Sequence, residues 1–234
     1  MPEVWYAPKK PLSGRDYWVA VLRKQPSAIL LAIQLLAILL LPWLEAQLWG
    51  RLVFVVISFF AVTIAAFVTR STPSLTWLAL LIGFPCVALE AWSVLSPDNV
   101  LVGAVGHFGL AAFYLYVAYG LVSYVFSDSW VTSDELFAVG AAFTVLLFAF
   151  AYLYLGVQFI WPDSFTGHVP GPRRSFLELL FFSAANLTSV GLSDVGAVRP
   201  HARAVTIIEQ LAGVMYVAMV ISRLVALTVA KARR

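Results

Sequence analysis

Charged residues are scarce in this chain of 234 residues: Asp, Glu, Lys and Arg together make up 12% of it, whereas 62% is hydrophobic. The mean hydropathy is +0.90. A soluble domain of this length would need much more polar surface, so a water-soluble globular fold is excluded. The lipid bilayer is the expected surroundings, because about 20 apolar residues are enough for one helical crossing.

Cysteine is almost absent, and no cluster of reactive side chains replaces it. Cys86 is the single cysteine, so an intrachain disulfide is excluded, and its position inside an apolar run is typical of packing. The three histidines, with Glu90 and Glu209, show no spacing typical of a metal site or a catalytic pair. We therefore expect no catalytic residue, no cofactor and no enzyme activity. The basic residues lack interleaved aromatics, which argues against nucleic-acid binding.

The chain has instead six long apolar runs. They cover residues 27–48, 52–69, 75–95, 100–126, 136–160 and 202–230. Because period-two alternation is absent, these runs predict transmembrane helices and an all-α, multi-pass membrane protein. With six crossings both termini lie on one side, and ten of the 15 Lys and Arg residues fall there. This bias predicts cytoplasmic termini in a plasma membrane.

A seventh apolar run, 176–187, is too short to span a bilayer. Ser175 and Glu178 form an S-x-x-E pattern at its start, which is a capping-box signal and predicts a re-entrant helix at 175–187. The next residues, NLTSVGLSD (186–194), are rich in small and hydroxyl-bearing side chains. Non-helical backbone at membrane depth is tolerated only inside protein or beside water, so this segment should border an aqueous path.

A polar loop near residues 128–134 predicts the boundary between two parts of the chain. Residues 27–132 are expected to form a four-helix peripheral domain, and residues 133–230 a helix, a re-entrant helix and a second helix. Residues 1–26 are expected to be a cytoplasmic segment. Within it, residues 12–22 fit a short interfacial helix and an irregular tail with an aromatic anchor about equally.

The second part resembles the pore of tetrameric potassium channels. In that family a short pore helix precedes a filter of the pattern T-x-V-G-Y-G-D, and here TSVGLSD (188–194) follows SFLELLFFSAANL. The resemblance covers about residues 134–227. The predicted inner helix at 202–230 is similar to that of bacterial members of the family. The resemblance implies a homotetramer in the lipid bilayer that conducts monovalent cations, with potassium as the permeant ligand, through a central pore lined by backbone carbonyls.

The resemblance also implies roles for individual residues. The implied filter consists of Thr188, Ser189, Val190, Gly191, Leu192 and Ser193, and the carbonyls of Ser189, Val190, Gly191 and Leu192 would bind potassium. Asp194 would support the outer mouth. Glu209 would either support the filter through a hydrogen bond to Ser183 or Thr188, or add negative potential to the pore. Gly213 matches the hinge glycine of the inner helix, and close helix packing is the alternative.

Two filter residues depart from the family pattern. Leu192 replaces a tyrosine that braces the filter in the family. Ser193 replaces a glycine, and left-handed backbone there would cost a non-glycine residue about 1–2 kcal/mol. Two alternatives therefore stay open beside potassium conduction. One is a weakly selective cation channel, and the other is a non-conducting or modulatory subunit that keeps the pore architecture.

The peripheral helices lack the arginines of a voltage sensor. Residues 100–126 contain no Lys or Arg, and His107 is their only titratable side chain apart from tyrosines. Voltage does work only on charges that move, so we expect no voltage gating. His107 is either structural or a pH sensor, while Glu90 and Arg223 are expected at the membrane interfaces. We expect no soluble regulatory domain in the chain, and the gating stimulus stays open.

Overall fold

The computed structural model describes residues 25–45, 73–95, 99–127, 133–168, 171 and 173–232, together with residues 47, 49, 50, 53 and 57. Its elements, in chain order, are α2 (Pro26–Glu45), α4 (Pro73–Leu95), α5 (Val100–Ser127), α6 (Ser133–Ile160), β1 (Phe165–Thr166), α7 (Phe176–Leu187), β2 (Gly196–Ala197) and α8 (Pro200–Ala232). The two short strands pair with each other in antiparallel fashion. The predicted helix at 52–69, the segment 12–22 and most of the loop at 128–132 lie outside the described residues.

Four of the described helices are long and apolar enough to cross a membrane: Pro26–Glu45, Val100–Phe126, Asp134–Ile160 and Pro200–Arg223. This confirms a multi-pass, helical membrane protein, while six crossings stay a prediction. The helix α6 begins three residues before the predicted start. Asp134 and Glu135 lie in its first turn, where carboxylates interact favourably with the positive end of the helix.

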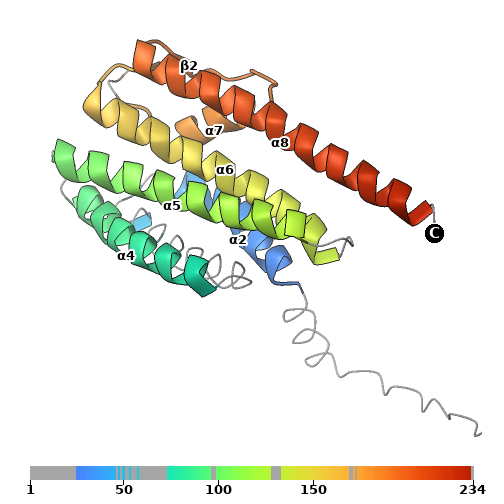
Figure 1. Cartoon of the computed structure of the whole chain (residues 1–234). Coiled ribbons are helices and arrows are strands. Elements are labelled where there is room, and N and C mark those ends of the chain that lie inside the picture. Colours follow the sequence, from blue (N-terminus) through green and yellow to red (C-terminus); the bar gives the residue numbers. More distant parts are fainter. Residues whose placement is uncertain are drawn as a thin grey trace, which may run out of the picture.

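The core of the bundle lies between α5 and α6, which pack against each other along much of their length. The helix α4 covers α5, and α2 covers α6 (Figure 1). Fully buried alanines of α6, such as Ala141 and Ala149, let the neighbouring backbones approach closely. Tyr114 stacks on Tyr152 between α5 and α6, with ring centroids 5.5 Å apart. Cys86 is free and buried, as predicted.

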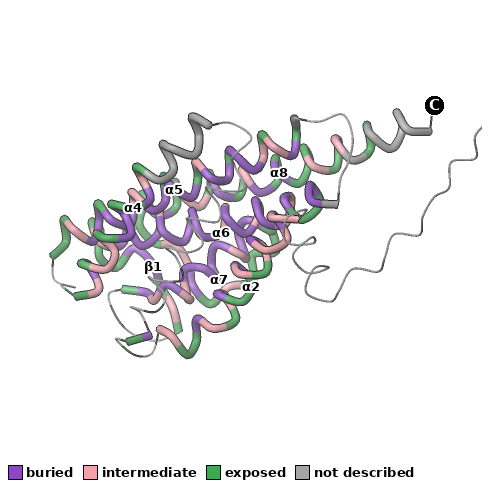
Figure 2. Tube along the Cα trace, turned by 90° about the horizontal axis from the view of Figure 1, so that it is seen from below, coloured by how far each residue is buried: buried purple, intermediate pink, exposed green. Residues whose placement is uncertain are grey.

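The short helix α7 packs against both α6 and α8. The spanning stretch of α6 is 56% buried, whereas that of α8 is only 17% buried. Figure 2 shows the same contrast, because buried residues fill α5 and α6 while α8 is largely exposed. The last turns of α8 project beyond the other helices (Figure 1). A long apolar helix with so little cover needs lipid or further protein around it.

Two titratable residues that we predicted at the membrane interfaces have partners on neighbouring helices. The Glu90 carboxylate lies 3.4 Å from Nε2 of His107, and both side chains are largely buried. The Arg223 guanidinium lies 3.7 Å from the carboxylate of Glu135. It also lies 5.1 Å above the ring of Phe126. Each side chain therefore has a partner from a neighbouring helix, and their positions at the membrane interfaces stay predictions.

Candidate functional site

The start of α7 carries the predicted capping box. Ser175 is the N-cap residue, and its hydroxyl accepts a hydrogen bond from the N–H of Glu178 at 3.2 Å. In return, the Glu178 carboxylate accepts from the N–H of Ser175 at 2.7 Å. Two of the amides that a helix start leaves without intrahelical acceptors are thereby satisfied by the local sequence.

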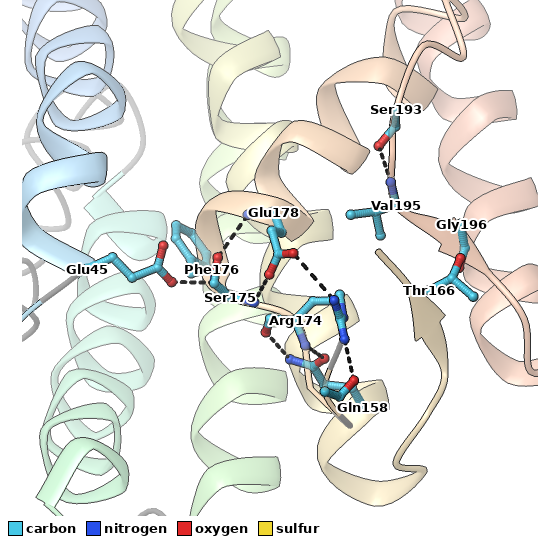
Figure 3. Close-up of polar contacts among 11 residues, drawn as sticks. Glu45, Gln158, Thr166, Arg174, Ser175, Phe176, Glu178, Ser193, Val195 and Gly196 are labelled. Carbon is cyan, nitrogen blue, oxygen red and sulfur yellow. Dashed lines mark hydrogen bonds and ion pairs between the residues drawn. The ribbon is translucent and has the colours of Figure 1, made fainter. Parts of the chain in front are cut away.

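Residues far away in sequence complete this helix start. The side-chain amide of Gln158, at the end of α6, donates to the carbonyl of Arg174 at 2.8 Å and accepts from its N–H at 2.7 Å. The Arg174 guanidinium lies 3.5 Å from Glu178. Glu45, the last residue of α2, accepts from the N–H groups of Phe176 and Leu177 (Figure 3). Sequence reasoning missed these contacts because no local pattern connects the partners.

The end of α7 runs directly into the candidate filter. The N–H groups of Thr188, Ser189 and Gly191 donate to the carbonyls of Ala184, Asn186 and Ala185, at 3.1, 2.9 and 2.8 Å. The Thr188 hydroxyl donates to the Ala184 carbonyl at 2.6 Å. The last turn of α7 is therefore closed by the first filter residues.

These hydrogen bonds fix the direction of two filter carbonyls. The backbone contains no cis peptide bond among the described residues, and in a trans peptide the N–H and the preceding C=O point in opposite directions. Because the N–H groups of Ser189 and Gly191 point at α7, the carbonyls of Thr188 and Val190 point away from it. The residues from Thr188 to Leu192 are all exposed in the single chain.

Left-handed backbone occurs at two positions of the segment. Gly191 has φ +71°, a conformation that glycine adopts at low cost. Ser189 has φ +60°, which fits the residue after a helix C-cap. Ser193 does not adopt left-handed backbone, so the cost that such backbone would have for a non-glycine residue does not arise at this position. The Ser193 hydroxyl accepts from the N–H of Val195 at 3.1 Å, a local turn that ordinary φ values allow.

The outer end of the segment is attached to the loop between α6 and α7. Val195 is buried, and β2 directly after it pairs with β1, so that Ala197 faces Phe165 and Gly196 faces Thr166 (Figure 3). Asp194 is exposed and makes no hydrogen bond within the described part of the chain. Its support role at the mouth stays a prediction. Two-residue strands leave no periodicity in a sequence, which is why sequence reasoning missed them.

A buried polar cluster joins α6, α7 and α8 behind the filter. Glu209 of α8 is fully buried. Its Oε1 accepts from the Ser183 hydroxyl, and its Oε2 accepts from the Tyr154 hydroxyl. Tyr154 also lies 3.3 Å from Thr206. The predicted hydrogen bond between Glu209 and Ser183 is confirmed, whereas Thr188 bonds to α7 and not to Glu209.

Two further contacts hold the end of α7 against α8. The side-chain amide of Gln210 donates to that of Asn186 at 2.8 Å. Gly213 lies directly against the backbone carbonyl of Leu187, and a Cβ atom at this glycine would collide with that carbonyl. The helix α8 continues through Gly213 without a break. Gly213 therefore allows α8 to pack closely against the end of α7, and the hinge role stays a prediction.

The single chain exposes apolar side chains over the filter and along α8. Val190 and Leu192 are 61% and 76% exposed. The large exposed side chains of α8 include Ile207, Ile208, Leu211, Val214, Met215, Val217, Met219, Ile221 and Val225. In the described ranges, no group of three or more His, Cys, Asp or Glu side chains is placed to hold a metal ion.

Residues 133–232 thus contain a helix long enough to span a membrane, a short apolar helix, an exposed loop and a second helix of spanning length. Residues 140–230 match the protein family described as Ion channel. The similarity to this family lies in the second part of the chain, and the matched family is not one of enzymes. No curated protein and no solved structure matches the chain.

Proposed function

We propose that four copies of this chain form a cation channel that conducts potassium through a central pore lined by residues 188–193. The observation that carries the proposal is the backbone direction: the N–H groups of Ser189 and Gly191 are used by α7. The carbonyls of Thr188 and Val190 therefore face the exposed side of the segment, where a dehydrated cation needs oxygen ligands. The carbonyls of Ser189, Gly191 and Leu192 complete the proposed ligand set.

Exposed apolar surface supports assembly into a tetramer. Leu192 at 76% exposure and Val190 at 61% exposure sit beside an aqueous path in this proposal, so neighbouring chains must cover much of their surface. The exposed apolar face of α8 has the same need. A four-fold arrangement around the filter would bring four α8 helices together and surround one ion with equivalent carbonyls.

Weakly selective conduction is a second candidate function. The N–H of Ser193 donates to the carbonyl of Gly191 at 3.2 Å. A carbonyl that already accepts a backbone hydrogen bond is a weaker ligand for an ion, which would remove one binding position from the outer half of the filter. The outer half is therefore where potassium and sodium would be discriminated least.

The proposal places the channel in the plasma membrane with both termini in the cytoplasm. Lys and Arg are in excess on the side of the termini, which supports this orientation. The described part of α5 contains no Lys or Arg, so voltage has little charge to move there.

Ion flux through purified protein in lipid vesicles tests the proposal. Potassium and sodium gradients are applied in turn to the natural chain, to Gly191→Ala and to the control Gly106→Ala. A Cβ atom at Gly106 makes only ordinary contacts with Leu89. We expect potassium flux in the natural chain and the control, and at least about a tenfold loss in Gly191→Ala, because a side chain at φ +71° is strained.

The outcome in sodium separates the candidates. Equal potassium and sodium flux would establish the weakly selective channel. Absence of flux under both gradients would favour a modulatory subunit, and Ser193→Gly would then be measured in the same vesicles. Recovery of potassium flux in that variant would locate the defect at Ser193, and continued absence would contradict the channel proposal for this chain alone.

A further inference from the structure

Glu45 connects the peripheral helix α2 to the start of α7. Its Oε1 accepts from the N–H of Phe176 at 2.6 Å, and its Oε2 accepts from the N–H of Leu177 at 3.2 Å. Figure 3 shows the carboxylate pointing from α2 toward this helix start. The partners are 131 and 132 residues apart in sequence. The contact therefore belongs to the tertiary structure and not to the local cap.

The two amides that Glu45 binds are those that the capping box leaves over. Ser175 and Glu178 satisfy each other's N–H groups. Phe176 and Leu177 are the first two residues of α7, and helices have no internal acceptor for these amides. The amides at the start of α7 thus have two sources of acceptors. The local capping box binds two of them, and the Glu45 carboxylate of α2 binds the other two.

The charge of Glu45 also suits its position. A carboxylate interacts favourably with the positive end of a helix. Glu178 brings a second carboxylate to the same turn, and Arg174 lies 3.5 Å from it. The guanidinium offsets the repulsion between the two acids, so both can remain close to α7.

The other end of α2 is fixed in a similar way. The carboxylate of Asp134 accepts from the N–H and the hydroxyl of Ser27 at 3.0 and 2.9 Å, and from the Tyr124 hydroxyl at 3.1 Å. The 20 residues of α2 correspond to about 30 Å of helix. The contacts of Asp134 therefore lie at the far end of α2 from the contact of Glu45 with α7.

We infer that Glu45 is a positioning residue for the filter, so that the peripheral part of the chain contributes to ion selection. The inference rests on the proposed function. The 12 residues of α7 form about three turns, and the filter follows without a linker. A change in the position of the first turn is transmitted by this short helix to the carbonyls of Thr188 and Val190. Glu45 acts through α7 and touches no ion.

Three substitutions test the inference in vesicles and by amide hydrogen exchange. Glu45→Gln removes the charge and one acceptor oxygen, and Glu45→Asp keeps the charge on a shorter side chain. Asp134→Asn is the matched control, because it makes the same chemical change at the opposite end of α2, far in sequence from α7. The measured quantities are the ratio of potassium to sodium flux and the exchange rates of the Phe176 and Leu177 amides.

For Glu45→Gln we expect a flux ratio about three- to tenfold lower and amide exchange faster by a similar factor, as loss of a cap predicts. Glu45→Asp should lie between Glu45→Gln and the natural chain in both quantities. Asp134→Asn should leave the flux ratio unchanged, even if it lowers the thermal stability. If Glu45→Gln fails to fold, Glu45→Asp is compared with the natural chain and with Asp134→Asn in its place.

Three results would overturn the inference or separate it from the proposed function. An unchanged flux ratio in Glu45→Gln would overturn it, and so would an equal drop in Asp134→Asn, which would indicate general destabilisation. If the natural chain conducts no cation, the proposed function fails by itself. Amide exchange then tests by itself whether Glu45 holds the start of α7. Unchanged protection of the Phe176 and Leu177 amides in Glu45→Gln would show that it does not.

Discussion

The two ends of α7 are held by different chemistry. At its start, the carboxylates of Glu45 and Glu178 and the hydroxyl of Ser175 accept hydrogen bonds from amides of the first turn. At its end, amides of the filter itself close the last turn, and α8 supports it from behind. Side chains can thus fix the start without touching the pore, whereas any change at the end also moves filter carbonyls.

The difference separates substitutions that act on the filter indirectly, through the position of α7, from those that act on it directly. Substitutions at the start of α7 alter its position while the filter backbone keeps its own hydrogen bonds. Substitutions behind its end remove the surface on which the filter rests. We therefore expect the second group to have the larger effects, and the substitutions below are ordered accordingly.

Glu209→Ala should have the largest effect. It leaves the hydroxyls of Ser183 and Tyr154 without their buried acceptor and opens a cavity between three helices. Loss of a buried partner that accepts two hydrogen bonds costs about 3 kcal/mol of unfolding free energy. Chemical denaturation in detergent measures this cost. Glu178→Ala is the comparison at the other end of α7, where the acid is partly exposed, and an equal loss there would contradict the proposed difference.

Gly213→Ala should have the next largest effect on the free energy of unfolding. The added Cβ atom would meet the backbone carbonyl of Leu187, which cannot move without moving the filter. Overpacking of this kind costs about 2 kcal/mol. The same substitution at Gly106, where space exists, is the control. Thermal unfolding and ion flux are measured together, and a Gly213→Ala protein with normal stability and altered flux would support the hinge role instead.

The contrast between the two ends also marks what the sequence can predict. The capping box of Ser175 and Glu178 was predictable because both halves lie within four residues. The bond between Glu209 and Ser183 was predictable because a buried acid in a membrane helix needs a partner nearby. The Glu45 contact spans 131 residues, and no local pattern indicates which acid will meet which helix start.

Backbone conformation was predictable only where the residue type restricts it. Gly191 has positive φ, which glycine adopts at low cost. The family has a glycine at the position of Ser193, and here the serine hydroxyl accepts a hydrogen bond in a local turn. The strain occurs at Ser189, earlier in the segment, because the helix C-cap requires left-handed backbone there.

Ser175→Ala should have a moderate effect at the start of α7. It removes the N-cap acceptor of the Glu178 amide, while Glu45 continues to bind the amides of Phe176 and Leu177. Loss of a serine N-cap costs about 1 kcal/mol. Denaturation in detergent measures the change. Ser175→Asp, which retains an acceptor and adds favourable charge, should recover most of it, and failure to recover would contradict capping as the cause.

Ser189→Gly should have the smallest effect and the opposite sign. Left-handed backbone at φ +60° is strained for serine and not for glycine. Relief of this strain is partly cancelled, because glycine gives the unfolded chain more freedom. The net gain in unfolding free energy is about 0.5 kcal/mol. The loss of the exposed Ser189 hydroxyl should lower potassium flux in vesicles, since we expect this hydroxyl to offer a cation one more oxygen beside the proposed carbonyl ligands. A variant that gains stability and keeps full flux would show that Ser189 serves only to end α7, and the boundary between helix and filter would then lie at Val190.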